Sequence, residues 1–252
     1  FQLPLIPDGF NFSAQIGSFK SPQAQSIIYP LSVDSNHALI TLHYAIVLKD
    51  PYHPFNFQPY ITIRIQDTNG ILLSGICNNY TIYPDSGTIP FQHGANNIKW
   101  LDWNTLSLDL SSLIGQNVEI LIATAACGHP DYFCYCYLVG ESNPLKIKRQ
   151  YCQNTIYARL EAPDGYISYL WKDSNNHTVG NTQSIKIPNA QVGTAYTVTM
   201  TNLLGCTTSI HAIIKKDSMK ASFICDSLNS RCYPTRVRLI ETSTYNTDYI
   251  SG

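Results

Sequence analysis

Charged side chains are scarce in this chain. They make up 13% of its 252 residues, against about 25% in an average soluble protein. The formal net charge is -1, and Lys and Arg do not form a run anywhere. Nucleic acids and anionic membranes are recognised through clustered positive charge, so we expect no nucleic-acid partner.

Long apolar stretches and helical periodicity are also missing. No apolar run approaches the ~18 residues of a spanning helix, so we expect no membrane insertion. No segment keeps apolar residues at positions i, i+3, i+4 and i+7 over three turns. Instead, apolar and polar residues alternate, as they do on strands that have one buried face. The clearest apolar sets are Ile61, Ile63 and Ile65; Leu106, Leu108 and Leu110; and Tyr196, Val198 and Met200.

Turn sequences such as "DTNG", "YPDSG" and "QHGANN" separate these runs, and the pattern predicts an all-β protein. Residues 1–148 hold enough strand candidates for a jelly-roll sandwich. Residues 149–216, with Trp171 inside "YISYLW", have the size and pattern of a small Ig-like sandwich. Residues 217–252 read as the start of a third β domain that is too short to enclose a core alone.

The cysteines are even in number, eight, and none is arranged as CxxC. This usage suits an oxidising compartment and a disulfide framework. A disulfide requires Cα atoms within about 4.4–6.8 Å, so cysteines on neighbouring strands are the expected partners. We predict the pairs Cys77 with Cys127, Cys152 with Cys206, and Cys225 with Cys232.

The remaining cysteines, Cys134 and Cys136, stand two apart on a predicted strand. Their side chains then share a face and run parallel, which disfavours a bond between them. We expect small core residues or alternative partners of Cys77 and Cys127. A zinc site formed by Cys127, His129, Cys134 and Cys136 is the competing reading, but the usual C-x2-4-C spacing is missing.

Three stretches resemble a known family. They are "HYAIVLKDPYHPFNFQPYITIRIQDTNG", "WLDWNTLSLDLSSLIGQNVEILIATAACGHPDYFCYCYLVG" and "YCQNTIYARLEAPDGYISYLW". They resemble repeated modules of giant cell-surface adhesins of gliding Bacteroidota, which are exported by the type IX secretion system. In that family a MAM-like jelly roll precedes Ig-like and PKD-like modules, and "CYPTRVRLIETST" resembles the start of a PKD-like module.

The resemblance implies a non-enzymatic segment of a longer, extracellular polypeptide at the cell surface, supporting attachment or gliding motility. Its implied partners are surface glycans, neighbouring modules of the same chain and, during export, the secretion machinery. Two alternatives remain open. One is a carbohydrate-binding accessory module of a secreted glycoside hydrolase, since jelly rolls are common among such modules. The other is a structural filament or sheath subunit.

A turn rich in aromatics and prolines follows the first strong strand, in "KDPYHPFNFQPY". Tyr52, His53, Phe55 and Phe57 are candidate ligand-binding residues, because aromatic faces stack on sugar rings while imidazole or the Asp50 carboxylate bonds to hydroxyls. The competing reading is a stiff corner, since three prolines fix the backbone and block pairing. We favour the corner.

Metal and catalytic signals are few. Two alternative loops supply the hard oxygen atoms that Ca²⁺ prefers, Asp34 and Asn36 in "SVDSN" or Asp102 in "WLDWN", so Ca²⁺ is the one candidate cofactor. The seven histidines are scattered, and the sequence contains neither G-x-S-x-G nor HExxH. We therefore expect no catalytic residues.

Overall fold

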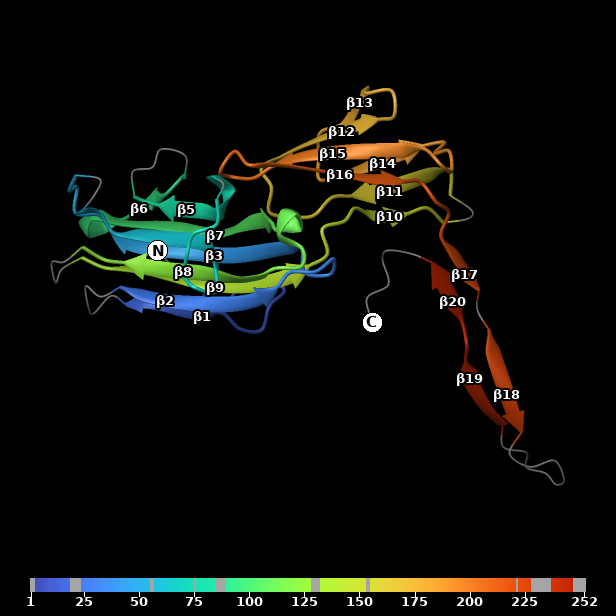
Figure 1. Cartoon of the computed structure of the whole chain (residues 1–252), viewed down its shortest axis with the longest axis horizontal. Coiled ribbons are helices and arrows are strands. Elements are labelled where there is room, and N and C mark those ends of the chain that lie inside the picture. Colours follow the sequence, from blue (N-terminus) through green and yellow to red (C-terminus); the bar gives the residue numbers. More distant parts are fainter. Residues whose placement is uncertain are drawn as a thin grey trace. The chain divides into compact units, whose positions relative to one another are not determined.

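A computed structural model describes residues 3–18, 24–54, 57–74, 76–84, 89–127, 132–152, 155–220, 222–227 and 237–246. The prediction of an all-β protein is confirmed: the described elements are strands and three short 3-10 helices, η2 (Ile76–Asn78), η3 (Ala95–Asn97) and η4 (Ser111–Leu113) (Figure 1). Among these residues, none belongs to a helix with the length and apolar character required to cross a membrane.

The chain forms two compact units. Unit 1 comprises residues 1–145 together with two later segments, 164–168 and 200–208; unit 2 comprises 146–163, 169–199 and 209–252. The two later segments had no counterpart in the predicted domain boundaries.

Unit 1 is a jelly-roll sandwich of two antiparallel sheets (Figure 1). The chain crosses between the sheets several times, so most neighbouring strands, such as β3 and β9 or β2 and β8, are distant in sequence. One sheet has the order β1 (Ala14–Ser18), β9 (Cys134–Asn143), β3 (Leu39–Lys49), β7 (Ile98–Asp109) and β6 (Gln92–His93). The other has the order β2 (Gln25–Ser32), β8 (Asn117–Ala125), β4 (Tyr60–Asp67) and β5 (Asn79–Ile82).

Alternation along the strands builds the core of unit 1. The apolar residues predicted for one face of β4, Ile61, Ile63 and Ile65, are at most 4% exposed and belong to one hydrophobic cluster with residues of the facing sheet. Leu106 and Leu108 of β7 and the following Leu110 join the same cluster. The pleat thus places the predicted residues between the sheets.

Ser107 departs from this alternation, because it is fully buried although it faces away from the core. Its hydroxyl donates to the carbonyl of Asp164 at 2.7 Å, and its own carbonyl accepts the Asn202 side-chain amide at 3.2 Å. Its backbone N–H donates to Gly165 at 3.1 Å. These contacts explain why segments 164–168 and 200–208 are part of unit 1.

Two further small sheets in an Ig-like arrangement consist mostly of unit 2 residues. One has the order β10 (Lys148–Gln150), β11 (Tyr157–Glu161) and β14 (Ser184–Pro188). The other has β13 (Thr178–Gly180), β12 (Ser168–Asp173), β15 (Ala195–Thr201) and β16 (Thr207–Ile213). Trp171 is fully buried, and its indole N–H donates to the carbonyl of Thr182 at 2.7 Å.

The last strands form two-stranded sheets. β17 (Ser218–Lys220) pairs with β20 (Thr244–Asn246), and β18 (Phe223–Ser227) pairs with β19 (Val237–Glu241), all antiparallel. Figure 1 shows the two pairs following one another along a single ribbon. Two strands alone bury little surface, and residues 221, 228–236 and 247–252 of this predicted third piece lie outside the described residues.

Candidate functional site

The aromatic turn 50–59 lies at one end of the sandwich, between β3 and β4. Two neighbouring connections are bonded to it there. The backbone N–H of Lys49 donates to Phe133 at 3.0 Å, and that of Asp50 donates to Asn97 at 2.9 Å. Residues from before β7 and before β9 therefore meet the turn, and we call this end of unit 1 the aromatic end.

A buried ion pair anchors the turn. The ammonium nitrogen of Lys99 lies 2.6 Å from Oδ2 of Asp50, and the two side chains are 5% and 0% exposed. The other carboxylate oxygen of Asp50 accepts the backbone N–H of Tyr52 at 2.8 Å. Because both carboxylate oxygens are engaged inside the protein, Asp50 holds the corner together and is not available to a ligand.

The Asp50–Lys99 pair also fixes the position of Tyr52. Its φ is +54°, in the left-handed region that a non-glycine residue rarely adopts. The Lys99 ammonium lies 5.7 Å from the centroid of its ring, within the range of a cation–π contact. With 65% of its surface exposed, the ring is held at the protein surface by a fixed backbone.

His53 faces the connection before β9. Its ring packs edge-on against Tyr132 with the centroids 5.5 Å apart, and Nδ1 lies 3.5 Å from the sulfur of Cys127. Lys49 places its ammonium 5.6 Å from the Tyr132 ring centroid. These contacts leave His53 and Tyr132 half-buried. His53 therefore packs beneath the exposed rings of the aromatic end.

The second half of the turn combines a buried corner with an exposed ring. Gln58 and Pro59 are buried, as a corner requires. Phe57 is 66% exposed, and its backbone N–H donates to Pro54 at 2.8 Å. The fourth predicted binding residue, Phe55, lies outside the described residues. The turn is thus a corner in its backbone and still presents two rings, those of Tyr52 and Phe57.

A row of aromatics on β9 continues this surface and was missed in the sequence analysis. The rings of Phe133 and Tyr135 are stacked at 5.9 Å, and those of Tyr135 and Tyr137 meet edge to face at 5.9 Å. The signal was the alternation in "YFCYCY", where aromatics and cysteines occupy opposite faces. Burial, and then the neighbouring Tyr137, raise the pKa of Tyr135.

The two alternative calcium loops lie far from each other. Oδ1 of Asp34 accepts the backbone N–H groups of Asn36 and His37 at 2.8 and 2.9 Å and lies 2.7 Å from Nδ1 of His37. Asp102 lies on β7 beside Leu101, which pairs with Ile46, whereas Asp34 lies beyond the opposite end of β3 at Leu39. At about 3.3 Å per residue, these positions are on the order of 20 Å apart.

The acceptor role of Asp34 has an electrostatic consequence. The hydrogen bond from the His37 side chain, followed by that from the Asn36 N–H, lowers the pKa of this carboxyl below its usual range. Asp34 therefore acts as the organiser of an Asx-type turn. In the part of the chain that the structure describes, no three His, Cys, Asp or Glu side chains gather as a metal site would require. The zinc alternative also involved His129, which lies outside the described residues.

The disulfide predictions for Cys77 and Cys206 were wrong. These two residues are bonded to each other, with Cα atoms 5.9 Å apart, while Cys127 and Cys152 are free thiols. Both bonded residues belong to unit 1. The bond joins η2 of the sandwich to the residue between the turn at 203–205 and β16.

Strand register explains why Cys77 cannot reach Cys127. Cys127 follows Ala125, which pairs with Tyr60 at the start of β4. Cys77 precedes Asn79, which pairs with Arg64 toward the other end of that strand. The two cysteines are therefore separated by most of the length of β4, on the order of 20 Å, far beyond disulfide reach. For the third predicted pair, Cys232 lies outside the described residues.

The other two cysteines behave as predicted. Cys134 and Cys136 are each 1% exposed, face the core from β9 and are free thiols. Burial raises the pKa of Cys134, and raises that of Cys136 to about 12. Both therefore act as small apolar core residues.

Comparisons with known proteins yield only distant similarities. No family model matches the chain, and no curated protein matches its sequence. Among solved structures, the chain is similar to the Endo-D glycoside hydrolase domain from Streptococcus pneumoniae R6, with 11% identity and a TM-score of 0.28 over 79% of this chain and 33% of that chain. It is also similar to the adhesin domain of Epf from Streptococcus pyogenes, with 9% identity and a TM-score of 0.21 over 80% of this chain and 75% of that chain. The chain thus spans about a third of the Endo-D chain.

Proposed function

We propose that this chain is a non-enzymatic segment of a large secreted cell-surface adhesin, and that the aromatic end of unit 1 contacts surface glycans. The observation that carries the proposal is the pair of rings, Tyr52 and Phe57, that are 65% and 66% exposed on a turn with an internal charge pair. Exposed rings on a rigid backbone suit stacking on the apolar face of a sugar.

The chemistry of the turn favours binding over catalysis. Its carboxylate, Asp50, is paired with Lys99, and its imidazole, His53, packs on Tyr132. The solvent-facing part of the turn therefore offers rings rather than a reactive acid or base. A glycosidase, in contrast, requires two carboxylates that flank the bond to be cleaved.

The Cys77–Cys206 disulfide and the low content of charge support an extracellular location, because such bonds persist mainly in oxidising environments. Attachment or gliding at the surface of a bacterium of the Bacteroidota, with export by type IX secretion, is the specific form of the proposal, based on the motifs quoted above. Neighbouring modules of the same long chain complete the expected partners.

A glycan array probed with the whole chain tests the proposal. We expect binding to at least one glycan class, and at least a tenfold loss when Tyr52 and Phe57 are both replaced by alanine. Tyr157→Ala is the matched control, because this tyrosine is also exposed, at 42%, but lies on β11 of unit 2. Absence of binding on every glycan class, or equal binding by the double variant, contradicts the glycan contact.

A carbohydrate-binding accessory module of a secreted glycoside hydrolase is the second candidate, since the same two exposed rings would serve it. The two candidates differ in where the glycan is found. Beads coated with the chain are passed over cells under flow. Retention of the beads on the cells favours the adhesin. Pull-down of the chain by insoluble polysaccharide, without retention of the beads on cells, favours the accessory module.

A further inference from the structure

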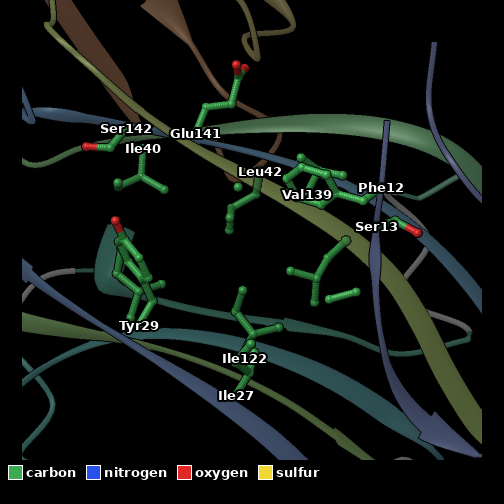
Figure 2. A pocket seen from close by; sticks show the side chains of 14 residues that line it. Phe12, Ser13, Ile27, Tyr29, Ile40, Leu42, Ile122, Val139, Glu141 and Ser142 are labelled. Atoms are coloured by element: carbon green, nitrogen blue, oxygen red, sulfur yellow. The ribbon is translucent and has the colours of Figure 1, made fainter. Parts of the chain in front are cut away.

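Unit 1 contains a cavity between its two sheets. Its volume is about 290 Å³, and its walls come from strands of both sheets. Figure 2 shows Leu42 and Ile40 on one side of the cavity and Ile27 and Ile122 on the other. The aliphatic residues that form most of the wall are Ile27, Ile40, Leu42, Ile120, Ile122 and Leu138.

The cavity is open because one edge of the sandwich is incomplete. β1 pairs only with Cys134–Leu138 of β9, and within the described residues no strand pairs with Val139–Asn143 on that side. Before β1, Phe12 and Ser13 still line the cavity, whereas the ring of Phe10 packs on His43 at 4.9 Å. β2, the facing edge, pairs with β8 alone.

Two residues of β2 are exposed to solvent because the cavity is open on this side. Ile27 and Tyr29 line the cavity and therefore face inward, yet they are 39% and 51% exposed. Leu31, two residues further along the same face, is 9% exposed and belongs to the core. Apolar side chains that point into a sandwich are normally covered, so this part of the core lacks part of its filling.

The wall chemistry selects the ligand. Among the residues that the structure describes, neither Lys nor Arg lines the cavity. The one acidic residue, Glu141, directs its carboxylate away from the cavity in Figure 2, and that carboxylate lies 3.4 Å from His43. The polar atoms near the cavity are hydroxyls. That of Ser142 is buried and has no partner in the described part of the chain, and Tyr29 extends its hydroxyl toward the same end in Figure 2.

We propose that this cavity binds an alkyl chain that carries an uncharged polar end, with the chain between the sheets and the polar end near Ser142. An engineered apolar cavity of ~150 Å³ holds one benzene molecule, so the present volume of about 290 Å³ accommodates roughly twice that apolar bulk. A charged end is disfavoured, because the wall supplies no opposite charge to a carboxylate or an ammonium group. The inference does not depend on the adhesin proposal.

Methyl-detected NMR of the whole chain tests it, with 1-hexanol, 1-octanol and 1-decanol as probes. We expect shifts at the methyl groups of Ile27, Ile40, Leu42 and Ile122. Burial of one CH₂ is worth about 0.8 kcal/mol, so affinity should rise about fourfold per added methylene and level off once the cavity is full. Octanoate and octylammonium should bind at least tenfold more weakly than 1-octanol.

Two tryptophan variants on β2 distinguish binding in the cavity from binding at the protein surface. Ile27→Trp fills the cavity from its exposed side and should abolish the shifts. Ile28→Trp is the matched control, since Ile28 is 48% exposed, does not line the cavity and points to the opposite face. Equal binding by both variants overturns the proposal.

The chain-length series on the unmodified protein provides a readout that does not depend on how the variants fold. Absence of methyl shifts with all three alcohols overturns the proposal. Equal affinity across the series does the same, because a chain buried in the cavity must gain from each methylene. If octanoate or octylammonium binds as tightly as 1-octanol, the uncharged-end requirement is wrong.

Discussion

The Lys99 ammonium nitrogen lies 2.6 Å from a carboxylate oxygen of Asp50, although both side chains are almost completely withdrawn from water. Lys99 is at the start of β7 and Asp50 directly follows β3. The pair therefore fixes the aromatic turn to a neighbouring strand of the same sheet. It also sets the position of Tyr52, which bonds to the same carboxylate and lies over the same ammonium.

Replacement of Asp50 by asparagine should destabilise the protein strongly. The change removes the carboxylate charge that faces the Lys99 ammonium in a site with 5% exposure, and breaking a buried pair in this way typically costs ~3–5 kcal/mol. Urea unfolding measures the effect. Asp102→Asn is the control, because this carboxylate is exposed and should change the free energy of unfolding by about 0.5 kcal/mol or less.

A second variant separates charge from packing at this site. Replacing Asp50 with leucine and Lys99 with methionine together removes both charges, so most of the lost stability should return. If the double variant is no more stable than Asp50→Asn alone, the loss comes from changed packing rather than from the broken charge pair.

Removal of the Cys77–Cys206 bond should lower stability by about 4–5 kcal/mol in the chain-entropy model, because the bond closes a loop with a sequence separation of 129 residues. A Cys77→Ser/Cys206→Ser variant and denaturant unfolding test this value. Cys152→Ser is the control, since Cys152 is a free, exposed thiol. Non-reducing peptide mapping should recover the linked peptides of Cys77 and Cys206; recovery of Cys77 linked to Cys127 would contradict the structure.

The same bond should limit how far the chain extends under force. The bond prevents the chain between the two cysteines, a sequence separation of 129 residues, from extending. This separation corresponds to roughly 40 nm of extended chain at ~3.3–3.6 Å per residue. Single-molecule pulling from the two ends should therefore release about this extra length when a reductant is present. An unchanged contour length on reduction would argue against a load-limiting role for the disulfide.

The buried thiols of β9 predict a loss of stability at alkaline pH. Burial raises the pKa of Cys136 from 9.0 to about 12, so the folded state retains this proton where the unfolded state releases it. Stability is then fully present below pH 9 and falls as the pH rises toward 12, by up to about 4 kcal/mol.

The contribution of Cys136 is isolated by comparison with Cys136→Ala. Unfolding free energies of both proteins at pH 8 and pH 10.5 measure it, together with the smaller effect of Cys136 on the pKa of Cys134. The slope should be shallower in the variant. Identical slopes would show that Cys136 ionises as freely in the folded protein as in the unfolded one.

Trp171→Phe should destabilise unit 2 by about 2–3 kcal/mol. The indole is fully buried and donates to Thr182 at 2.7 Å, so phenylalanine leaves both a void and an unsatisfied carbonyl. Because the change removes a tryptophan, its fluorescence cannot be compared between the two proteins. Thermal unfolding is therefore followed by far-ultraviolet circular dichroism. Leu170→Ala, at a neighbouring site with 40% exposure, should have a smaller effect.

Local patterns in the sequence were sufficient for the strands and their buried faces. Ile61, Ile63 and Ile65 alternate with Thr62 and Arg64, and the pleat of an extended chain alone places the isoleucines on one face. The same reasoning placed Cys134 and Cys136 in the core. It also identified the prolines of the aromatic turn as a corner.

Contacts between distant segments were not predictable in this way. The partner of Cys77 depends on which strand ends meet, and the sandwich separates Cys77 from Cys127 by most of the length of β4. The Asp50–Lys99 pair depends on the neighbouring positions of β3 and β7.

The cavity depends on where β1 stops pairing with β9. The sequence by itself thus determined an all-β chain with its core residues, because alternation is a property of a single strand. The disulfide, the buried charge pair and the cavity were decided only by tertiary structure, because each requires a register between strands that local sequence does not encode.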